Sequence, residues 1–458
     1  MEIPTDSFAI HLAHVFAAAG HQLFLVGGAV RDALLGYSQA DLDFATDAPP
    51  EAALTILSSV EDAHPYRIGE RFGTIGARIG HRHVEITTYR SNEQYVIGSR
   101  KPIVRFGATL LEDLTRRDFT VNAMGLDPVT GELIDPLDGR SDLRARVLRA
   151  VGRPGERFRE DPLRLLRAVR FSARLDFSIE RHTWEAMREQ AATVTEISRE
   201  RIRDEYSRLL TGPNVGRGLT LLRDSGLVDT SVPHLLELAR MADHGPRHPL
   251  SLWDHTMRVV EGVEPDLTLR WAALLHDIAK PQTRTLEADG RIRFFHHEDR
   301  GALVAREILL GLRYPGQFVD GVSLLVETHM QIHAYHDDWS DGAVRRLMMR
   351  LGPLTSGAIV LAGADASGHS AHGTSWNAPK FVALESRIRE LQREPVEGLR
   401  SPLSGDDLMR RFELPPGEWI RVIKDALSEE VLEGRLRPHD REAAWQLAEA
   451  LARDAGIA

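Results

Sequence analysis

Two aspartates separated by one leucine, Asp41 and Asp43, are residues whose types and spacing indicate chemistry. Residues i and i+2 of a β-strand point to the same face of a sheet, so both carboxylates would project together while Leu42 turns into the core. Two carboxylates on one face can hold two Mg²⁺ ions about 4 Å apart, which suits in-line displacement at a phosphorus atom. Glu85, in the segment HVEITTYR, is the candidate for a third carboxylate on a neighbouring strand.

A pair of glycines precedes these aspartates. Gly27 and Gly28 follow the apolar segment LFLV, and a glycine turn allows backbone N–H groups to approach a triphosphate closely. Arg31, one helical turn further on, can form charge-assisted hydrogen bonds with the same phosphates. Taken alone, an Asp-x-Asp pair more often marks a solvated strand edge, and a Gly-Gly pair a plain turn. The ordered set of glycines, arginine and carboxylates is what predicts a nucleotide site.

Arginine carries nearly all the positive charge of this acidic chain. The net charge is −10, and 53 of the 57 basic residues are Arg, so phosphate binding here must use forked guanidinium groups. The segment 140–174 holds eleven Arg against four acidic residues, a local balance of +7. The overall charge argues against a uniformly basic nucleic-acid binder, but this local stretch can still bind a polyanion.

Two further motifs combine acids with arginines. RRDFTVNAM (116–124) places Asp118 beside two Arg, where a carboxylate can accept a hydrogen bond from a ribose 2′-OH. In EDPLR (160–164) we expect Asp161 and Arg164 to lie on one helix face, so that both can point at one ligand. Cytosine and adenine each present an amine next to an acceptor, which such a pair can recognise, whereas uracil and guanine do not. In isolation, either motif more often forms an ordinary helix ion pair.

The second half of the chain is rich in histidine. Twelve of the 20 His lie between His234 and His372. A His, a His–Asp doublet, later His residues and a final Asp follow one another in order. Imidazole and carboxylate together suit Mn²⁺, Fe²⁺, Ni²⁺, Zn²⁺ or Mg²⁺. A single His is more often a core or surface residue, so the ordered set carries the prediction.

The elements that position these residues follow from the hydrophobic pattern. The segments 23–28 and 41–46 predict strands, and 73–90 predicts a hairpin. From residue 143 to about 235 the pattern is helical, with EDPLRLLRAVRFSARLDF (160–177) as the clearest helix.

Helices are also expected from about residue 250 to 375 and, as small elements, over the last fifty residues, with no repeats. The predicted fold class is therefore α+β, a small mixed β-sheet head followed by all-α domains. The expected boundaries are 1–142 for the head, 143–235 for a helical neck, 236–375 for the histidine-rich domain and 376–458 for a helical tail.

Composition limits the class of protein. With 458 residues the chain is too long for one ordinary core, and we expect about three or four domains. The absence of Cys excludes disulfides, thiolate zinc sites and a Cys nucleophile. The apolar content of 42% suits a folded soluble protein, and we see neither a signal peptide nor an 18-residue apolar run, so we expect a cytoplasmic protein without a membrane partner.

The segment GGAVRDALLGYSQADLDFAT (27–46) resembles the signature of the polymerase-β-like nucleotidyltransferases, specifically the bacterial-type (class II) tRNA nucleotidyltransferases, or CCA-adding enzymes. The motifs at 116–124 and 160–164 follow in the family order and resemble its ribose-recognising and base-reading motifs. The resemblance covers about residues 20–235. It implies a head that binds Mg²⁺ at Asp41 and Asp43 and adds nucleotides from CTP and ATP to tRNA.

The resemblance also implies roles for the motif residues. Asp118 would recognise the ribose, with Arg117 and Asn122 near the sugar and phosphates, and Asp161 with Arg164 would select the base. Further along the expected helix we interpret three arginines as lining the nucleotide or RNA side, although a solvated helix face is nearly as common. They are Arg167, Arg170 and Arg174.

The polar segment 91–107 resembles the mobile loop of the family, whose full length accompanies addition of the terminal A. Its length here favours complete CCA addition, and an ordinary surface loop is the alternative. It holds three candidate RNA-binding residues, Arg100, Lys101 and Arg105.

The histidine set resembles the HD phosphohydrolase superfamily. The resemblance implies one metal, such as Mn²⁺, Ni²⁺ or Mg²⁺, held by four residues, and a second completed by two more. The first group is His255, His276, Asp277 and Asp365, and the second adds His297 and His329. Some members of this superfamily hydrolyse 2′,3′-cyclic phosphates and phosphomonoesters, which would suit trimming of damaged RNA ends.

We therefore interpret the chain as a template-independent enzyme that builds or repairs the 3′ CCA of tRNA. The close alternatives are a poly(A) polymerase and an A-adding or CC-adding member of the same family. The mixed charge of the segment 439–458 argues against the poly(A) polymerase. An alternative of another class is an HD phosphohydrolase whose first half binds RNA or a nucleotide as a regulator. A non-catalytic tRNA-folding protein would not need Asp41 and Asp43.

Overall fold

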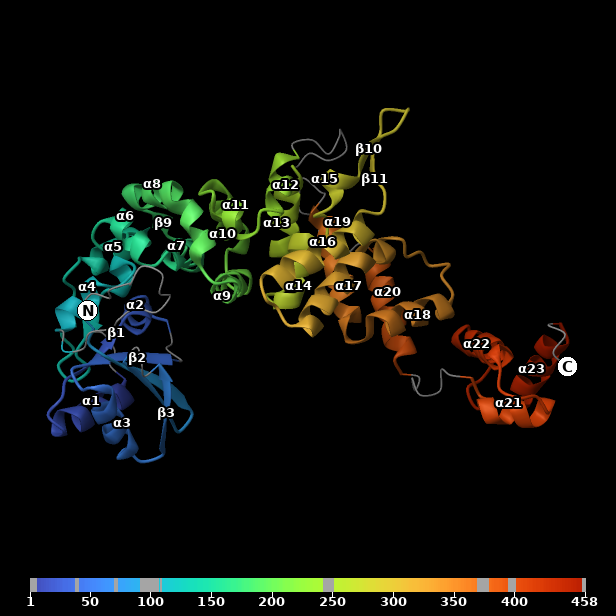
Figure 1. Cartoon of the computed structure of the whole chain (residues 1–458), viewed down its shortest axis with the longest axis horizontal. Helices are drawn as coiled ribbons and strands as arrows, with labels where there is room; N and C mark the ends of the chain where they lie inside the picture. The colour runs from blue at the N-terminus through green and yellow to red at the C-terminus, as the bar shows by residue number, and fades with distance from the viewer. Residues whose placement is uncertain are drawn as a thin grey trace. The chain divides into compact units, whose positions relative to one another are not determined.

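The computed structural model describes residues 6–37, 41–69, 73–90, 107, 109–241, 251–368, 379–393 and 401–454. The chain divides into two compact units, Met1–Pro233 and His234–Ala458. The first unit contains the sheet and a layer of helices, and the second is almost entirely helical (Figure 1).

The sheet of the first unit has seven strands in the order β3-β4-β5-β2-β1-β6-β7. Strands β2 and β5 pair in parallel, whereas their neighbours pair antiparallel, so the sheet is mixed. The strands are β1 Leu23–Val26, β2 Asp41–Thr46, β3 Ala63–Gly69, β4 Thr74–Ile79, β5 Arg82–Thr88, β6 Gly125–Leu126 and β7 Leu133–Ile134.

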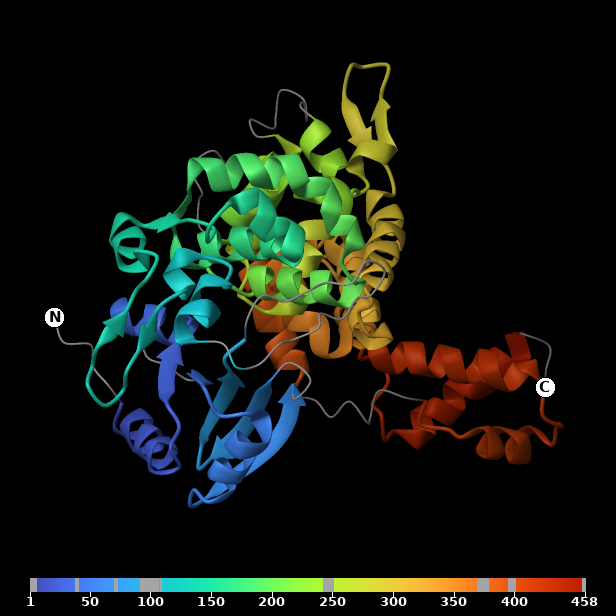
Figure 2. The same cartoon turned by 60° about the vertical axis from the view of Figure 1, so that its left-hand side comes forward.

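Two apolar helices cover one face of this sheet, and the opposite face carries Asp43 and Glu85. Helices α1 (Ser7–Ala18) and α3 (Pro50–Ser58) pack on the strands, and α2 (Gly28–Leu34) lies on the other side (Figures 1 and 2). Alternation along β2 buries Leu42 and Phe44, at 2% and 1% exposure. Asp43, which lies between them, is exposed and points to the opposite face.

Helices complete the first unit above the sheet. Helix α7 (Leu163–Leu175) is central and mostly buried, and it packs against α9 and α10. The short strands β8 (Val147–Leu148) and β9 (Ser178–Ile179) pair in parallel beside it. The other elements are α4 Leu110–Thr115, η2 Thr120–Asn122, α5 Gly139–Ala145, α6 Pro154–Glu160, α8 Arg181–Gln190, η3 Ala191–Glu196, α9 Arg199–Leu210, α10 Val215–Asp224 and α11 Leu227–Ser231.

The second unit is a helical domain followed by three further helices. Its elements are α12 Leu235–Arg240, α13 Leu252–Gly262, α14 Leu267–Leu275, α15 Lys280–Thr283, β10 Arg284–Leu286, β11 Ile292–Phe294, α16 His297–Gly311, α17 Gly316–His333, α18 Asp341–Leu351, η4 Gly352–Leu354, α19 Thr355–Gly368, α20 Pro379–Leu391, α21 Gly405–Phe412, α22 Glu418–Leu432 and α23 Arg441–Asp454. The last three enclose a core of their own around Leu408, Leu427 and Ala448. Arg346 of α18 forms ion pairs with Glu429 of α22 and with Glu433, the residue that follows α22.

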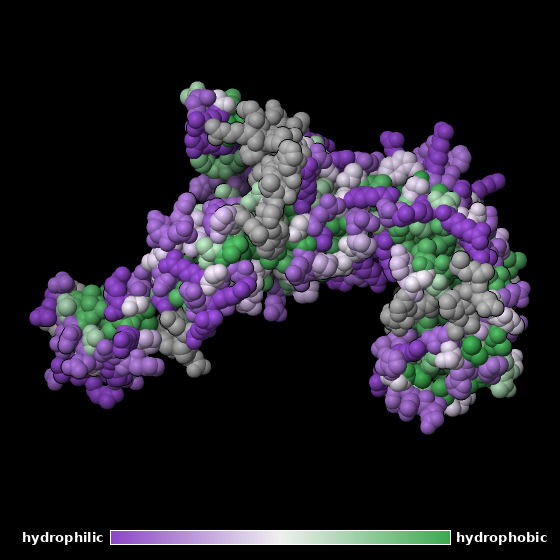
Figure 3. All heavy atoms as spheres, turned by 180° about the vertical axis from the view of Figure 1, so that it is seen from behind, coloured by the Kyte–Doolittle hydropathy of each residue, from purple (hydrophilic) through white to green (hydrophobic). Residues whose placement is uncertain are grey.

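One stretch, Asp341–Gly368, is long and apolar enough to cross a membrane by length and composition. It is interrupted by the 3₁₀ turn η4, and half of its apolar window is buried within the unit. It also carries the buried Asp365. Hydrophilic residues cover most of the face visible in Figure 3. The stretch has the properties of a core helix pair of a helical domain.

The predicted α+β class is confirmed, and so are the two head strands and the hairpin at 73–90. The sequence pattern did not predict β3, β6 and β7, which are short or lie at sheet edges. The expectation that the later domains are all-α is corrected to mostly helical, because the short strand pairs β8–β9 and β10–β11 lie within them. The division into units falls between Pro233 and His234, and the four-domain boundaries stay a prediction.

The helix expected over 160–177 is wrong at its start. Helix α6 ends at Glu160, Asp161 has an extended backbone (φ −148°, ψ 100°), and α7 begins only at Leu163. The reason is Pro162, because proline disfavours the helical conformation in the residue before it. Asp161 therefore lies in a turn between two helices.

Candidate functional sites

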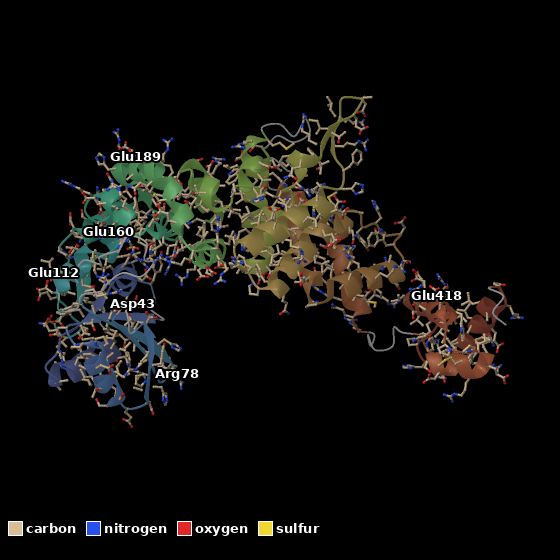
Figure 4. The ribbon with its side chains drawn as sticks, in the orientation of Figure 1. Asp43, Arg78, Glu112, Glu160, Glu189 and Glu418 are labelled. Atoms are coloured by element: carbon tan, nitrogen blue, oxygen red, sulfur yellow. The ribbon has the colours of Figure 1, made fainter. Side chains whose placement is uncertain are left out.

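The predicted catalytic carboxylates come from two adjacent parallel strands. Asp43 of β2 is the register partner of Glu85 of β5, and Asp41 is that of His83. Register partners on adjacent strands point to the same face, so Asp43 and Glu85 stand side by side. Both are exposed and line the same cavity, and Figure 4 shows Asp43 where the sheet faces the helices. The side chain of Asp41 lies outside the described part of the structure.

A cavity of about 910 Å³ lies over these carboxylates. Its floor is formed by β2 and β5, and its walls by α2, α7 and the turn that follows α9. Carboxylates on one side and guanidinium groups on the other can together hold a metal-bound triphosphate. The arginines that line it are Arg31, Arg117, Arg167, Arg170, Arg174 and Arg208.

Gly27 is required by its conformation and by a close contact. It joins β1 to α2 with φ +68°, a left-handed value that other residues rarely adopt. A Cβ atom there would lie 2.6 Å from Nη1 of Arg117. Gly28, the next residue, begins α2 and lines the cavity.

A chain of hydrogen bonds connects α2 to α7 beneath the cavity. Arg31 donates from Nη1 to Oδ1 of Asn122 over 2.6 Å, and Asn122 donates from Nδ2 to Asp118 over 3.0 Å. Arg167 of α7 donates from Nε to Oδ2 of Asp118 over 2.8 Å. Arg31 also pairs with Asp32, at 2.7 Å between Nη2 and Oδ1. The predicted ribose-motif residues and the glycine-turn arginine therefore form one network.

Asp118 lies behind the cavity wall and is not one of the residues that line it. It is 8% exposed, and its oxygens accept hydrogen bonds from the backbone N–H of Phe119, from Asn122 and from Arg167. Burial alone would raise its pKa, but Arg167 and the hydrogen bond from Asn122 lower the pKa to about 2. In this structure the ionised carboxylate holds Asn122 and Arg167 in the cavity wall.

Phe171 is a cavity residue that the sequence analysis missed. Its ring lies 5.2 Å from the guanidinium carbon of Arg31, 5.2 Å from that of Arg167 and 4.3 Å from that of Arg170. One aromatic ring therefore orders three cations. The available signal was spacing, because Arg167 and Phe171 lie four residues apart on α7 and share a face.

Asp113 is a second missed residue. It is 1% exposed and accepts hydrogen bonds from Arg116 and Arg117, at 2.9 and 3.0 Å. Burial opposes its ionisation, but these two arginines lower the pKa of its carboxyl group. The spacing in EDLTRR indicated the pairs, and the structure adds that they hold Arg117 against Gly27.

Asp161 and Arg164 are not brought together. Asp161 pairs with Arg201 of α9 at 2.8 Å, and Arg164 pairs with Glu160 at 2.7 Å. Arg164 also donates to the backbone carbonyl of Arg116. Neither is among the residues that line the cavity. The expectation of one shared helix face is corrected, because the turn at Pro162 separates the two side chains.

The remaining predicted arginines divide into two groups. Arg170 is buried and donates to Glu205 over 2.6 Å, and Arg174 donates to Asp32 over 3.1 Å from the cavity rim. Arg170 therefore fixes α7 to α9, whereas Arg174 links α7 to α2. Arg100, Lys101 and Arg105 lie outside the described residues, as does nearly all of the segment 91–107.

In the second unit, four histidines surround Asp277. The Nε2 atoms of His255 and His276 lie 3.5 and 3.1 Å from its Oδ2. Those of His297 and His329 lie 3.4 and 4.0 Å from its Oδ1. Each pair of histidines forms a group with Asp277 whose ligand atoms are close enough to share one ion. The carboxylate thus stands between two candidate metal positions.

Asp365 joins the first group. Its Oδ1 lies 3.1 Å from Nε2 of His255 and 3.7 Å from Nε2 of His276. Its Oδ2 lies 2.8 Å from Nε2 of His333, a residue missed although it follows His329 by one helical turn on α17. The structure therefore brings together all six predicted ligands of this region. His296 is exposed and pairs with Asp299 instead.

Backbone carbonyls orient the histidine rings. Nδ1 of His276 lies 2.8 Å from the carbonyl oxygen of Ala273, and those of His297 and His329 lie 2.9 and 2.6 Å from the carbonyls of Phe294 and Val326. When Nδ1–H donates to a carbonyl, Nε2 is left as an acceptor facing the centre. This is the arrangement that metal-binding histidines normally have.

Asp277 is almost fully buried, and neither of its oxygens makes a hydrogen bond of normal geometry within the described residues. Lys280 places Nζ 2.6 Å from Oδ2. Burial opposes ionisation, but His276 and Lys280 lower the pKa of Asp277 well below its usual value. The donor set and the poorly satisfied carboxylate fit a pair of divalent cations.

Three sequence families match successive parts of the chain. They are described as "Poly A polymerase head domain" for residues 23–149, "Probable RNA and SrmB- binding site of polymerase A" for 176–238 and "HD domain" for 247–367. The fold and the two sites therefore define a nucleotidyltransferase with an HD domain.

Relatives match over nearly the whole length. The A-adding tRNA nucleotidyltransferase of Deinococcus radiodurans is 33% identical over 88% of this chain and 90% of its own length. The CC-adding tRNA nucleotidyltransferase of Thermus thermophilus is 34% identical over 93% of each chain. The crystal structure of the Bacillus stearothermophilus CCA-adding enzyme in complex with CTP superposes with a TM-score of 0.72 at 26% identity, covering 98% of both chains. The chain belongs to the tRNA nucleotidyltransferase family.

Proposed function

We propose that this enzyme adds all three nucleotides of the 3′ CCA to tRNA, using CTP and ATP. The observation that carries the proposal is the cavity in which Asp43 and Glu85 face six arginines. The similarity of this chain to a CCA-adding enzyme whose structure was solved in complex with CTP, over 98% of both chains, supports the choice of nucleotide. The full length of the segment 91–107 supports complete addition.

The carboxylates position the reacting groups. Asp43 and Glu85, with Asp41 two residues earlier on β2, would hold Mg²⁺ against the α-phosphate. Bound Mg²⁺ would supply a Lewis acid that polarises the phosphate and lowers the pKa of the attacking 3′-OH. The chain itself fixes the spacing of the carboxylates that would hold the metal, because strand pairing places Asp43 and Glu85 side by side.

The β1–α2 side of the cavity would receive the triphosphate. Gly28 and Arg31 line this side, and Arg117 packs against the Cα of Gly27. Their N–H groups would stabilise the negative charge that develops on the departing pyrophosphate. Asn122 and Arg167, held by Asp118, would contact the sugar and base side of the nucleotide.

Asp161 and Arg164 would select the base after a rearrangement. Their present partners, Arg201 and Glu160, would have to be released before both side chains could reach the cavity. The turn at Pro162 is the joint at which such a change of direction is possible without breaking a helix. The motif resemblance supports this role.

The reaction is tested by incorporation of labelled CTP and ATP into tRNA transcripts ending before CCA, after CC and after CCA. Growth by C, C and A followed by a stop is the expected result. Addition of C alone would indicate a CC-adding enzyme, and A only onto CC an A-adding one. A long A tail would indicate a poly(A) polymerase.

The HD site supports a second proposal, a metal-dependent phosphohydrolase activity on 2′,3′-cyclic phosphates or phosphomonoesters of RNA ends. The carrying observation is Asp277 between two groups of histidines. Mn²⁺ and Ni²⁺ are the leading candidates and Mg²⁺ is a third, because the ligands combine imidazole and carboxylate. Phosphate release from a 3′-phosphorylated RNA, with each metal in turn, tests the proposed hydrolysis.

A cytoplasmic location follows from the proposed tRNA substrate.

A further inference from the structure

The row of cross-strand partners that contains the catalytic carboxylates continues to the edge of the sheet. Asp43 of β2 is opposite Glu85 of β5, Glu85 is opposite Gly76 of β4, and Gly76 is opposite Tyr66 of β3. Cross-strand partners share a face, so all four positions belong to the face that forms the cavity. Tyr66 lines that cavity together with Asp43 and Glu85.

The ring of Tyr66 lies flat along this row because its neighbour has no side chain. A Cβ atom on Gly76 would lie 2.5 Å from Cε2 and 2.6 Å from Cζ of the Tyr66 ring. The register of β3 against β4 shifts immediately after Tyr66, and such bulges redirect side chains and occur often beside active sites. The next residue, Arg67, points to the opposite face and pairs with Glu51 of α3.

Tyr66 is 38% exposed although it lines the cavity. An aromatic face that is open to a polar cavity is suited to stacking against a base. The ring leans over β4, about two strand spacings or roughly 10 Å from Asp43. That distance is close to the span of one nucleotide from its 3′ oxygen across its base.

The order of the strands indicates which base would stack on Tyr66, that of the incoming nucleotide or that of the RNA primer. The proposed triphosphate side of the cavity is at β1 and α2, on one side of the carboxylates, and Tyr66 lies on the other side in the order β3-β4-β5-β2-β1. In-line displacement brings the attacking 3′-OH from the side opposite the leaving pyrophosphate. The attacking strand therefore enters over β4 and β3.

We propose that Tyr66, held flat by Gly76, is the platform on which the 3′-terminal base of the RNA primer stacks before attack. The inference rests on the proposed nucleotidyl transfer and adds a primer-binding residue to it. Stacking there fixes the terminal sugar with its 3′-OH toward Asp43 and Glu85. The interaction accepts any base, as an enzyme that extends a changing 3′ end requires.

The test compares Tyr66→Ala with the wild type on a tRNA transcript lacking CCA, in the full-length enzyme. A stacked base is worth on the order of tenfold or more in binding, so kcat/KM for the primer should fall about tenfold while KM for CTP stays within about twofold. Tyr66→Phe should retain activity, and Gly76→Ala should lose it in part by displacing the ring. Val129→Ala, an exposed apolar residue of the same unit, is the control for folding and exposure.

A primer whose 3′-terminal nucleotide lacks its base separates stacking from a general loss. The wild type should lose about as much on this primer as Tyr66→Ala loses on the normal one, and combining both changes should give no further loss. Additive losses, or an effect on KM for CTP alone, would overturn the inference. If the wild type incorporates nothing, the proposed function itself fails. If Tyr66→Ala is as active as an active wild type, only the role of Tyr66 fails.

Discussion

The two units both gather carboxylates suited to divalent cations, but they do so in opposite surroundings. In the head, Asp43 and Glu85 are exposed on the floor of a large open cavity, and arginines face them. In the second unit, Asp277 is 1% exposed and enclosed by histidines from several helices. An exposed pair leaves room for a substrate to supply ligands and for the metal to exchange. A buried cage supplies most of the ligands itself and couples metal binding to the stability of the domain.

The difference shows which interactions bring the residues of each site together. Strand pairing alone positions the head carboxylates, so their surroundings can remain open to RNA and nucleotides. The predicted HD ligands come from α13, α14, α16, α17 and α19 or their ends, so only the packed helical core brings them together. Substitutions should therefore act on chemistry in the head and on metal content in the second unit.

The largest effect is expected for Asp43→Asn. Nucleotide incorporation should fall by about a thousandfold or more, because the neutral amide cannot hold the metal that stabilises the transition state. The fold should be unchanged, since Asp43 is exposed. Single-turnover incorporation of labelled CTP measures the effect, and Glu132→Gln, an exposed acid of the same unit, is the matched control. Activity within tenfold of the wild type would contradict the assignment of the site.

The stability of the cavity wall should depend on pH through the ionisation of Asp118. Its folded pKa of about 2 lies below the unfolded value near 3.8. Its ionisation therefore contributes about 2 kcal/mol above the unfolded pKa, and this contribution is lost as pH falls from about 5 toward 2. Asp118→Asn should lower the stability of the wall at pH 7, and the deficit should shrink toward pH 3.

Hydrogen exchange of peptides from residues 118–175, measured against pH in both proteins, tests this coupling. A constant difference between the wild type and Asp118→Asn over the whole pH range would show that the ionised carboxylate does not hold Arg167.

A smaller effect is expected for Asp161→Ala, which should reduce the preference for CTP over UTP about tenfold. Arg201→Ala removes the present partner of Asp161 and is the comparison variant. If Asp161 reads the base, only its own replacement relaxes the choice. If the ion pair is merely structural, both variants should behave alike in misincorporation assays and in melting temperature.

The smallest effect on transfer is expected for Asp277→Asn. The variant should lose bound metal by elemental analysis and lose any phosphate release, while CCA incorporation stays within about twofold. Asp289→Asn, on the exposed turn of the β10–β11 hairpin, is the control. A tenfold fall in incorporation would show that the two metal sites are coupled and would break the contrast between the units.

Local patterns predicted the parts of each site that depend on nearest neighbours in the chain. The alternation in DLDFAT was enough to predict that Leu42 is buried, and the glycine pair predicted the turn at Gly27. The prediction that Asp161 and Arg164 share a helix face was wrong, because helical spacing was assumed across Pro162, and proline disfavours the helical conformation in the residue before it. Phe171 and Asp113 were missed although their spacing from Arg167 and Arg117 was visible in the sequence, because spacing alone does not show which of many possible pairs are buried.

The sequence by itself determined the α+β class and the strand that carries Asp43, because periodicity is a local property, and its resemblance to the HD superfamily predicted six metal-binding residues of the histidine-rich region. The tertiary structure decided which of these residues meet. Register across strands brings Glu85 beside Asp43 and aligns Tyr66 with them, and helix packing encloses Asp277. These contacts join residues tens of positions apart, and only the folded backbone fixes their distances.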